Sequence, residues 1–314
     1  MTQTVIALDV GGTGIKCALV GADGDARHTV LHAERHPTGA ERGGAAVIAT
    51  ILDIAEGLAA TARAKDLEPI GAGLVVPGVI DEVNGVAVWA ANVGFRDVPL
   101  KALLEARLGL PAALGHDVRA GGLAEARLGA GRGEDYVLVI PIGTGIAAAN
   151  VVHGHVYTGA HGAGGEIGHI VVRPGGRECG CGQRGCLEAI ASASAVGKRY
   201  SEQAGRPATA EEVARLAAEG EPTAVEVWRE TIDALADGLM TGIALFDPAV
   251  IVLGGGLAEA GEALLAPLRE GVHARVTFHR EPEITRAALG DEAGCLGAAL
   301  IALDNLMHTK ESKA

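Results

Sequence analysis

The 314-residue sequence lacks several features that would each define a class of protein. It opens MTQTVIALDVGG, with no basic segment ahead of an apolar stretch, so we expect no signal peptide. No run of apolar residues reaches the ~18 that a membrane-spanning helix needs. Lys and Arg number 26 against 39 acidic residues, and a net charge of -13 does not suit phosphate backbones. These absences predict a cytoplasmic protein that binds neither membrane nor nucleic acid.

Cysteine is scarce as well, with five residues in the chain, yet three of them share the glycine-rich stretch RECGCGQRGCLEA at 177–189. In a reducing compartment, clustered thiols indicate a metal site rather than disulfides. Cys179, Cys181 and Cys186 supply three of the four tetrahedral ligands that a structural zinc usually takes. The fourth must come from elsewhere, and the candidates are His153, His155, His161 and His169. We interpret Cys17 and Cys295 as small buried side chains.

The common phosphate-binding motifs are absent too. There is no G-x-x-x-x-G-K-[ST], and DVGGTG at 9–14 has neither the spacing nor the following helix of a dinucleotide-binding loop. This turn instead joins two strand-like runs, and its backbone N–H groups could form an anion-binding nest. Asp9 would point a carboxylate into the same space, which becomes favourable with Mg²⁺ between it and a phosphate. The alternative, a plain hairpin turn, fits this loop equally well on its own.

Two further glycine turns follow apolar strands. Gly143-Thr144-Gly145 is the second turn, and Gly254-Gly255-Gly256 is the third. The third precedes a helix, whose N-terminus could face a phosphate or a ribose. By itself it is more simply an ordinary strand-to-helix turn. Together the three turns could converge on one nucleotide.

Hydrophobic periodicity predicts alternating strands and helices. We expect strands at 5–10, 15–20, 71–80, 112–115, 136–142, 146–152 and 249–253, and an Asp23-Gly24 turn after the second. We expect helices at 41–65, 100–108, 118–128, 221–246, 259–270 and 290–307, and a capping box at Thr209–Glu212 that begins another. DVGGTGI and PIGTGIA share Gly-Thr-Gly-Ile, which is a weak sign of internal duplication.

DVGGTGIK, GTG, the cysteine turn and VLGGG, in this order, resemble the ROK family of sugar kinases and repressors over nearly the whole chain. The resemblance implies an α/β, two-domain actin-like ATPase (ribonuclease H-like) fold with duplicated halves, a cleft between the domains and a zinc-stapled loop. We expect an N-terminal α/β domain at 1–117, completed by a C-terminal helix at 295–314. A larger C-terminal α/β domain at 118–294 would carry the zinc loop.

The resemblance also implies roles for individual residues. GGEIGH-x₉-CGCGQRGCLE matches the family's zinc motif and assigns the metal to His169, Cys179, Cys181 and Cys186. Sugar contacts are implied for Asn92, His116, Asp117, Glu166, His169 and Glu188. Nucleotide and phosphate contacts, with Mg²⁺ bound alongside ATP, are implied for Asp9, Gly11, Gly12, Thr13, Gly14, Lys16, Gly143, Thr144, Gly145, Gly254, Gly255 and Gly256.

Asp117, in GHDVRAGGLAEA, is implied to be the catalytic base, although its position alone favours a helix N-cap. His116 departs from the family, which usually has Asn before the aspartate. The histidine could replace the hydrogen bonds of that Asn or change which sugar fits.

The function that follows is ATP-dependent phosphorylation of a hexose, with glucose as the expected substrate and glucose 6-phosphate as the product. One alternative is a kinase for N-acetylmannosamine, N-acetylglucosamine, fructose or mannose, which His116 keeps open. The other is a non-catalytic sugar-sensing regulator. The retained Asp117 and the eight residues ahead of Asp9, too few for a DNA-binding helix-turn-helix, argue against it. Relatives are commonly dimers or tetramers, so we expect a homo-oligomer.

Overall fold

The computed structural model describes residues 3–22 and 28–311, with side chains up to Met307, so the Asp23-Gly24 turn lies outside it. The chain forms two compact units. Unit 1 contains residues 1–124, 159–163 and 291–314, and unit 2 contains residues 125–158 and 164–290. The boundary thus falls between residues 124 and 125, inside a helix, rather than after residue 117. The first turns of this helix stay with unit 1 because Arg119 bonds Glu82 and the Gly162 carbonyl there.

Unit 1 is built on a five-stranded sheet of order β3-β2-β1-β4-β8. The strands are β1 (Gln3–Val10), β2 (Gly14–Ala22), β3 (His28–Pro37), β4 (Pro69–Val76) and β8 (Ala112–His116). The first three run antiparallel, whereas β4 and β8 run parallel to β1. The strand expected at 71–80 ends at Val76, because Gly78 adopts a φ of +102° and reverses the chain.

The sequence reading missed a small second sheet in unit 1. After the reversal, β5 (Val79–Asp81) pairs with β6 (Val86–Ala90), and β6 pairs with β7 (Phe95–Val98). These strands are three to five residues long, which is too short to show a clear alternation of apolar and polar residues.

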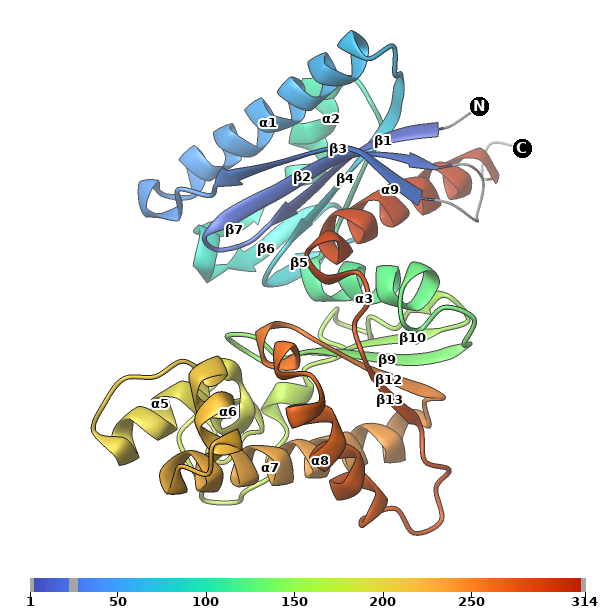
Figure 1. Ribbon diagram of the computed structural model, residues 1–314. Helices are drawn as coiled ribbons and strands as arrows, with labels where there is room; N and C mark the ends of the chain where they lie inside the picture. Colours follow the sequence, from blue (N-terminus) through green and yellow to red (C-terminus); the bar gives the residue numbers. More distant parts are fainter. Residues whose placement is uncertain (1–2, 23–27, 312–314) are drawn as a thin grey trace. The chain divides into compact units, whose positions relative to one another are not determined.

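Helices cover both faces of the unit 1 sheet. These are α1 (Gly44–Ala64), α2 (Leu100–Leu108), the first part of α3 (Asp117–Leu128) and α9 (Ala293–Glu311). Figure 1 shows α1 and α9 on opposite sides of the strands. Alternate residues of β1, such as Ile6 and Leu8, share a buried core with α1. Asp9 has the opposite parity and therefore points to the face that α9 covers, where it meets Gly294.

Among the described residues, α1 is the one helix long and apolar enough to cross a membrane by length and composition. Asp53, Glu56 and Arg63 interrupt this helix, so it contains no unbroken apolar run of ~18 residues. Seven residues of α1 are buried, and they belong to the core of unit 1. The core helix of a folded domain passes the same test.

Unit 2 repeats the architecture of unit 1. Its sheet has the order β11-β10-β9-β12-β13. The strands are β9 (Tyr136–Pro141), β10 (Ala149–Val152), β11 (His155–Val156), β12 (Val250–Gly254) and β13 (Glu283–Arg286). Three antiparallel strands are again followed by two parallel ones. The shared Gly-Thr-Gly-Ile segments follow the first strand of each sheet, so this short match marks equivalent positions in two halves of one topology.

The helices of unit 2 follow the sequence pattern in part. They include α4 (Glu188–Ala191), α5 (Ala193–Ala204), α6 (Ala210–Ala218), α7 (Pro222–Phe246) and α8 (Glu262–His273). The Thr209 side chain caps α6 by accepting from the Glu212 N–H, as the capping box predicts. α5 was missed, and the helix expected at 259–270 is interrupted at Gly261, whose φ of +57° no α-helix accommodates.

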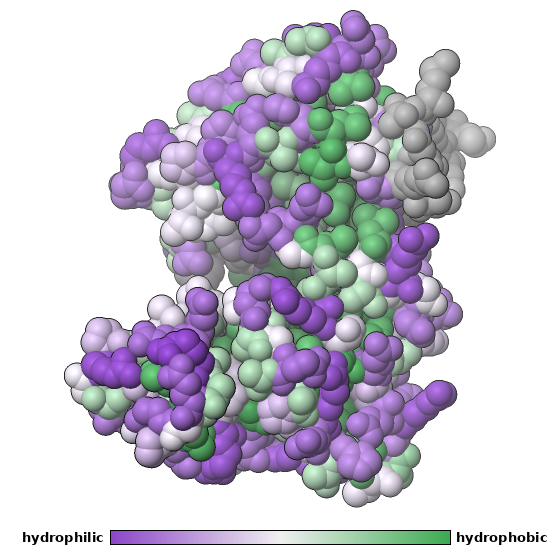
Figure 2. Space-filling model, viewed as in Figure 1, coloured by the Kyte–Doolittle hydropathy of each residue, from purple (hydrophilic) through white to green (hydrophobic). Residues whose placement is uncertain are grey.

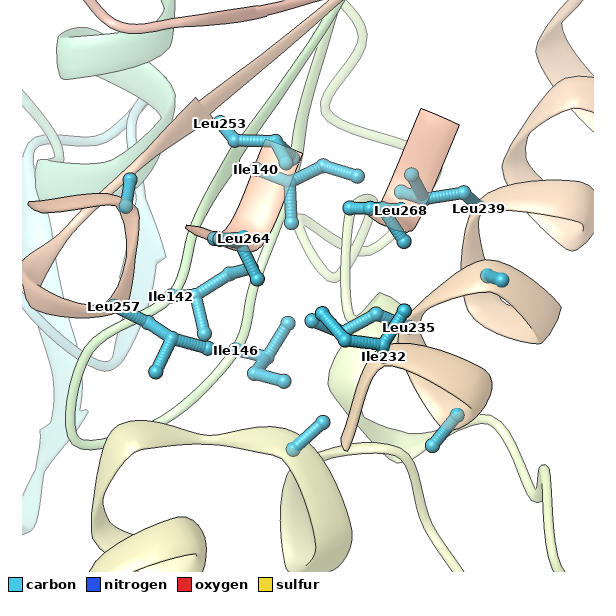
Figure 3. Close-up of a cluster of buried hydrophobic side chains, with 14 of the residues drawn as sticks. Ile140, Ile142, Ile146, Ile232, Leu235, Leu239, Leu253, Leu257, Leu264 and Leu268 are labelled. Atoms are coloured by element: carbon cyan, nitrogen blue, oxygen red, sulfur yellow. The ribbon is translucent and has the colours of Figure 1, made fainter. Parts of the chain in front are cut away.

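Large aliphatic side chains fill the space between the sheet and helices of unit 2. Figure 3 shows Ile140 and Leu253 from neighbouring strands pointing toward Leu235 and Leu239 of α7 and Leu268 of α8. In the view of Figure 2, the outer surface of these helices is mainly hydrophilic. The helices therefore turn their apolar faces inward, as amphipathic helices around a core do.

Candidate active site

Asp9 lies near the carboxyl end of β1, and Asp117 directly follows β8, which runs in the same direction in the unit 1 sheet. β1 and β8 both pair in parallel with β4, so their ends meet at one edge. Burial, followed by the negative charge of Asp117, raises the pKa of Asp9 to about 6, and the positive charge of Lys16 partly opposes this rise. The Asp9 carboxylate lies against Gly294, where a Cβ atom would approach Oδ2 to 2.1 Å. A buried carboxylate whose pKa is raised by a second carboxylate nearby is suited to binding a cation.

The first glycine loop is a tight connection between β1 and β2. The Gly11 N–H donates to the Gly14 carbonyl over 2.8 Å. Thr38, which is fully buried and was missed by the sequence analysis, donates its hydroxyl to the Gly11 carbonyl over 2.7 Å and its N–H to the Thr13 carbonyl over 3.1 Å. The loop therefore has a fixed shape. Asn92, on the 3₁₀ helix Ala91–Val93, lies beside Gly12.

Lys16, expected beside the phosphates, is engaged within unit 1. Its Nζ lies 3.1 Å from Oδ1 of Asp291, and Arg35 binds the other oxygen of Asp291 at 2.7 Å. The Asp291 side chain is 64% exposed, so this pair contributes at most about 1 kcal/mol. Such a weak pair leaves the lysine able to turn toward a stronger anion such as a phosphate.

Asp117 begins α3 but does not cap it. Its Oδ1 accepts from the N–H of the adjacent Val118 over 2.7 Å and lies 3.3 Å from Nδ1 of His116. A capping side chain would accept from the N–H two or three residues ahead. The Asp117 carboxylate is about 29% exposed, so it remains reachable by a substrate hydroxyl.

Glu82 and Arg119 brace the end of β8, and sequence reasoning found neither. Arg119 is 4% exposed and donates to one oxygen of Glu82 over 2.8 Å and to the Gly162 carbonyl over 2.8 Å. The same Glu82 oxygen accepts from the His116 N–H over 3.3 Å. Glu82 therefore fixes the backbone just before Asp117, and the contacts of Arg119 fix the first turn of α3 just after it. The one signal of this contact in the sequence is Arg119 itself, a long charged residue among the small residues of HDVRAGGLAEA.

The second and third glycine loops lie side by side in unit 2. They follow β9 and β12, which are parallel neighbours. The Ile142 N–H donates to the Gly254 carbonyl over 2.8 Å, and the Leu257 N–H donates to the Ile142 carbonyl over 3.0 Å. Gly255 has a φ of +76° and a Cβ there would lie 2.6 Å from the Ile142 carbonyl, so only glycine fits. Ile142 and Ile146, which flank the second loop, point into the core in Figure 3.

Glu188 lies against the second loop. Its Oε2 accepts from the Ile146 N–H over 2.9 Å, and a Cβ on Gly145 would come within 2.5 Å of the same oxygen. The sequence analysis assigned Glu188 to the sugar and Gly145 to phosphate, and the structure makes them neighbours. A carboxylate at this point could therefore touch a sugar hydroxyl and shape the phosphate loop together.

Four metal-binding side chains converge in unit 2. One donor atom from each of His169, Cys179, Cys181 and Cys186 lies within 4.8 Å of all the others. His169 Nδ1 is 3.6 Å from the Cys179 sulfur, and the sulfurs of Cys181 and Cys186 are 3.7 Å apart. Tetrahedral zinc with ligand bonds of about 2.0–2.3 Å needs separations of this size. The donor set therefore fits zinc. Of the four candidate histidines, His169 is the one beside the sulfurs.

The pKa values of the clustered thiols show that negative charges on neighbouring sulfurs would repel one another. Burial, followed by the neighbouring sulfurs, raises the pKa of Cys186 to about 12, whereas a backbone hydrogen bond at Gln183 lowers that of Cys181. A bound cation would offset the repulsion between thiolates. With Nδ1 toward the sulfurs, His169 keeps Nε2 on the side of Glu166, whose nearest oxygen is 3.9 Å away.

Salt bridges that the sequence analysis did not predict hold the segment before the cysteines. Arg173 donates to Asp237 of α7 over 2.5 Å and also pairs with Asp233, and Arg275 binds the same two carboxylates. Salt bridges to α7 therefore anchor the segment that leads into the cysteines.

The predicted site residues thus fall into two groups, one in each unit. Unit 1 holds Asp9, Gly11, Gly12, Thr13, Gly14, Lys16, Asn92, His116 and Asp117. Unit 2 holds Glu166, His169, Glu188, the four metal-binding residues and both remaining glycine loops. Within each group, hydrogen bonds and close contacts join most of the members.

Comparison with known proteins gives a consistent result. The sequence model of the ROK family matches residues 5–305. A glucokinase of Thermotoga maritima is 36% identical over 314 residues, covering 95% of this chain and 96% of that protein. The ROK hexokinase structure from Thermus thermophilus has a TM-score of 0.83 at 36% identity, covering 98% of this chain and all of the other.

A second similar structure was solved with ligands. It is a ROK family glucokinase from Streptomyces griseus in complex with glucose and AMPPNP. Its TM-score is 0.79 at 29% identity, and it covers 96% of this chain and 99% of its own.

Proposed function

This chain belongs to the ROK family, and from that premise we propose that it transfers the terminal phosphoryl group of ATP to glucose, forming glucose 6-phosphate and ADP. The observation that carries the proposal is the placement of Asp9 and Asp117 at one strand edge, close enough for the charge of one to raise the pKa of the other. A similar glucokinase spans nearly the full length of the chain. The class of enzyme is a sugar kinase of the actin-like ATPase fold.

Asp117 is the proposed general base. As the 6-hydroxyl oxygen attacks the γ-phosphorus, its proton passes to the Asp117 carboxylate. One O–P bond forms, the bond between the γ-phosphorus and the bridging oxygen breaks, and ADP leaves with the bond's electrons. The Glu82–Arg119 brace fixes the backbone of the base. Mg²⁺ held beside Asp9 would supply the positive charge that neutralises the phosphates.

We propose six side chains as sugar contacts. Glu166 and Glu188 would accept hydrogen bonds from sugar hydroxyls, since carboxylates are strong acceptors. His169 would offer Nε2 to the same sugar while Nδ1 binds a structural zinc with Cys179, Cys181 and Cys186. Asn92, His116 and Asp117 would complete the contacts from unit 1.

For the nucleotide, we propose that the three glycine loops supply backbone N–H groups. Gly11–Gly14 has its shape fixed by Thr38, and the second and third loops are held together through Ile142. A preformed loop loses little conformational entropy when it binds a phosphate. Lys16 would exchange its exposed pairing with Asp291 for a phosphate oxygen.

We also propose that the enzyme works in the cytoplasm as a homo-oligomer, as the sequence analysis predicts. The alternatives, another hexose or N-acetylhexosamine as substrate and a sugar sensor without catalysis, are less well supported than glucose phosphorylation. The Asp9–Asp117 pair gives no advantage to a pure sensor.

The test measures ADP release with ATP and Mg²⁺ against a panel of sugars, on protein whose zinc content is known. We expect kcat/KM to be highest for glucose. A preference for an N-acetylated hexosamine would replace the substrate while keeping the mechanism. Glucose binding by calorimetry without any ADP release would overturn the kinase proposal and leave a sensor.

A further inference from the structure

A second group of metal-binding side chains lies in unit 1, in the β2–β3 pair. Cys17 on β2 pairs directly with Glu34 on β3. The Cys17 sulfur, a Glu34 carboxylate oxygen and a His36 ring nitrogen all lie within 4.8 Å of one another. None of these residues has a part in the proposed phosphoryl transfer. The sequence analysis interpreted Cys17 only as a small buried side chain.

Strand geometry places these groups on one face. In a strand, residues i, i+2 and i+4 point to the same side, so His32, Glu34 and His36 share a side. Cys17 lies opposite the central residue, and its sulfur is 3.5 Å from the Glu34 carbonyl oxygen. β3 is the edge strand of its sheet. The cluster therefore opens toward solvent along one side and is closed by the sheet on the other.

Glu34 is held between the two histidines. Nε2 of His32 lies 2.7 Å from one carboxylate oxygen, and Nε2 of His36 lies 3.0 Å from the other. These hydrogen bonds lower the pKa of Glu34, with the His32 bond contributing most. Glu34 is therefore an ionised carboxylate that lies between two imidazoles and close to the buried sulfur of Cys17.

Exposure differs among the donors in a way that suits entry of an ion. Cys17 is 1% exposed, whereas the side chains of Glu34 and His36 are 37% and 36% exposed. An ion arriving from solvent would meet the carboxylate and the imidazole first, and the sulfur would close the site from beneath. No rearrangement of the backbone is needed to bring the donor atoms to the separations of about 3–4 Å found in a tetrahedral site.

We propose that Cys17, Glu34 and His36 form a binding site for a divalent transition metal of the zinc class, with His32 orienting the Glu34 carboxylate. Sulfur, imidazole and carboxylate donors together favour zinc, cobalt or cadmium over magnesium or calcium, which prefer oxygen alone. Binding displaces the Cys17 thiol proton to solvent. A water molecule completes the coordination. His32 acts as the hydrogen-bonded partner that such ligand carboxylates and imidazoles usually have.

The site is connected to the first glycine loop through β3. His36 lies two residues before Thr38, whose hydroxyl and N–H hold the Gly11 and Thr13 carbonyls. A metal that links β2 to β3 therefore stiffens the support of that loop. The inference does not rest on glucose phosphorylation, because metal binding at this cluster is measured without substrate.

The experiment counts metal on the full chain. Protein cleared of metal with a chelator is titrated with zinc and then, in separate samples, with cadmium for cadmium NMR. We compare the wild type with Cys17→Ser and His36→Ala. The matched control is His273→Ala, which removes an exposed histidine that pairs with Glu281 in unit 2. Circular dichroism of each metal-free variant establishes that it is folded.

We expect each of the two site variants to bind one zinc fewer per chain than the wild type, or to bind that zinc at least tenfold more weakly. The control should match the wild type. The wild type should also show a cadmium resonance of a site with a single sulfur, and Cys17→Ser should lose it. Because Cys17 is buried, His36→Ala keeps the test valid if the serine variant fails to fold. Equal zinc stoichiometry and affinity in wild type and His36→Ala would overturn the proposal and leave a hydrogen-bonded His–Glu–His ladder. Displacement of the bound zinc by millimolar magnesium would do the same.

Discussion

The carboxylate of Glu188 accepts a hydrogen bond from the N–H of Ile146 over 2.9 Å, directly beside the second glycine loop. Only one residue, Leu187, separates Glu188 from Cys186. The Leu187 N–H in turn donates to the Ile170 carbonyl, next to His169. A short covalent and hydrogen-bonded path therefore connects the four metal-binding residues, a proposed sugar contact and a proposed phosphate loop. Disturbance of the metal cluster should reach both substrates.

The two roles of Glu188 can be separated by two substitutions. Glu188→Gln keeps an oxygen for the Ile146 N–H but loses the charge that would bind sugar hydroxyls. Glu188→Ala leaves that N–H without its partner, at a cost of about 1–3 kcal/mol. We expect Gln to raise the KM for glucose and to change the KM for ATP little, and Ala to raise both. Steady-state kinetics with each substrate varied will check this. An unchanged KM for ATP in the alanine variant would contradict the role in the loop.

The positions of many strands along the chain could be predicted from local patterns. Val5–Val10 and Ala249–Leu253 are short apolar runs that end in glycine, and such runs form buried strands wherever helices cover both faces of a sheet. The cysteine turn was equally informative, because glycines that cannot build a core placed three sulfurs within one loop. These features depend on neighbours close in sequence, which is why they were visible without a structure.

Other parts depended on contacts between distant residues. Thr38 and Arg119 look ordinary in sequence, and their roles come from partners that β3 and α3 bring to them. The Cys17–Glu34–His36 cluster arises from strand register, which a sequence specifies only through the fold. The helix expected at 259–270 begins at Glu262 instead, because the backbone at Gly261 does not continue a helix.

Asp117→Asn should remove most of the turnover. An amide cannot accept the hydroxyl proton, so we expect kcat to fall by roughly 10²–10⁴-fold. The shape of the side chain is kept, so the Kd for glucose should stay within a few-fold of the wild type. Stopped assays of ADP release and calorimetric glucose titrations measure the two effects. Asp135→Asn, an exposed aspartate paired with His153, is the control. Wild-type turnover in Asp117→Asn would remove Asp117 from the mechanism.

Asp9 should make the metal-free protein less stable as pH rises. Its folded pKa of about 6 exceeds the ordinary 3.8, so the folded state binds the proton more tightly than the unfolded chain does. Stability is therefore lost between about pH 4 and pH 6, by up to about 3 kcal/mol, and stays low above that. Asp9→Asn removes this penalty. Denaturant unfolding should show the variant to be more stable than the wild type near pH 8, with a smaller difference near pH 5. The same variant should have little activity. Equal stability of the variant and the wild type at both pH values would show that ionised Asp9 does not destabilise the folded protein.

Cys181→Ser tests whether the metal shapes the sugar site. Cys181 is exposed, so the change creates no cavity and acts mainly through the lost ligand. We expect zinc content to fall and the Kd for glucose to rise by at least tenfold. The reason is that the proposed zinc fixes the positions of both His169, a ligand, and Glu188, which follows Cys186 by two residues. Metal analysis and calorimetry on the same preparation measure both. Gln183→Ala changes an exposed residue of the same loop that supplies no ligand, and it should keep zinc and glucose affinity. Normal glucose binding by zinc-free Cys181→Ser would separate the metal from the sugar site.

His116→Asn restores the residue usual in the family and tests sugar choice. The His116 backbone N–H bonds Glu82, and the substitution leaves that bond in place. What changes is the side chain 3.3 Å from the Asp117 carboxylate, and thus the proposed hydrogen-bond donor to the sugar. One such hydrogen bond contributes about 1–2 kcal/mol, so we expect the ratio of kcat/KM between glucose and the N-acetylated hexosamines to change roughly tenfold. The KM for ATP should stay within about twofold of the wild type, since His116 is not among the proposed nucleotide contacts. If kcat/KM changes by the same factor for every sugar, His116 acts only by positioning Asp117, and the residues that select the sugar lie elsewhere among Asn92, Glu166 and Glu188.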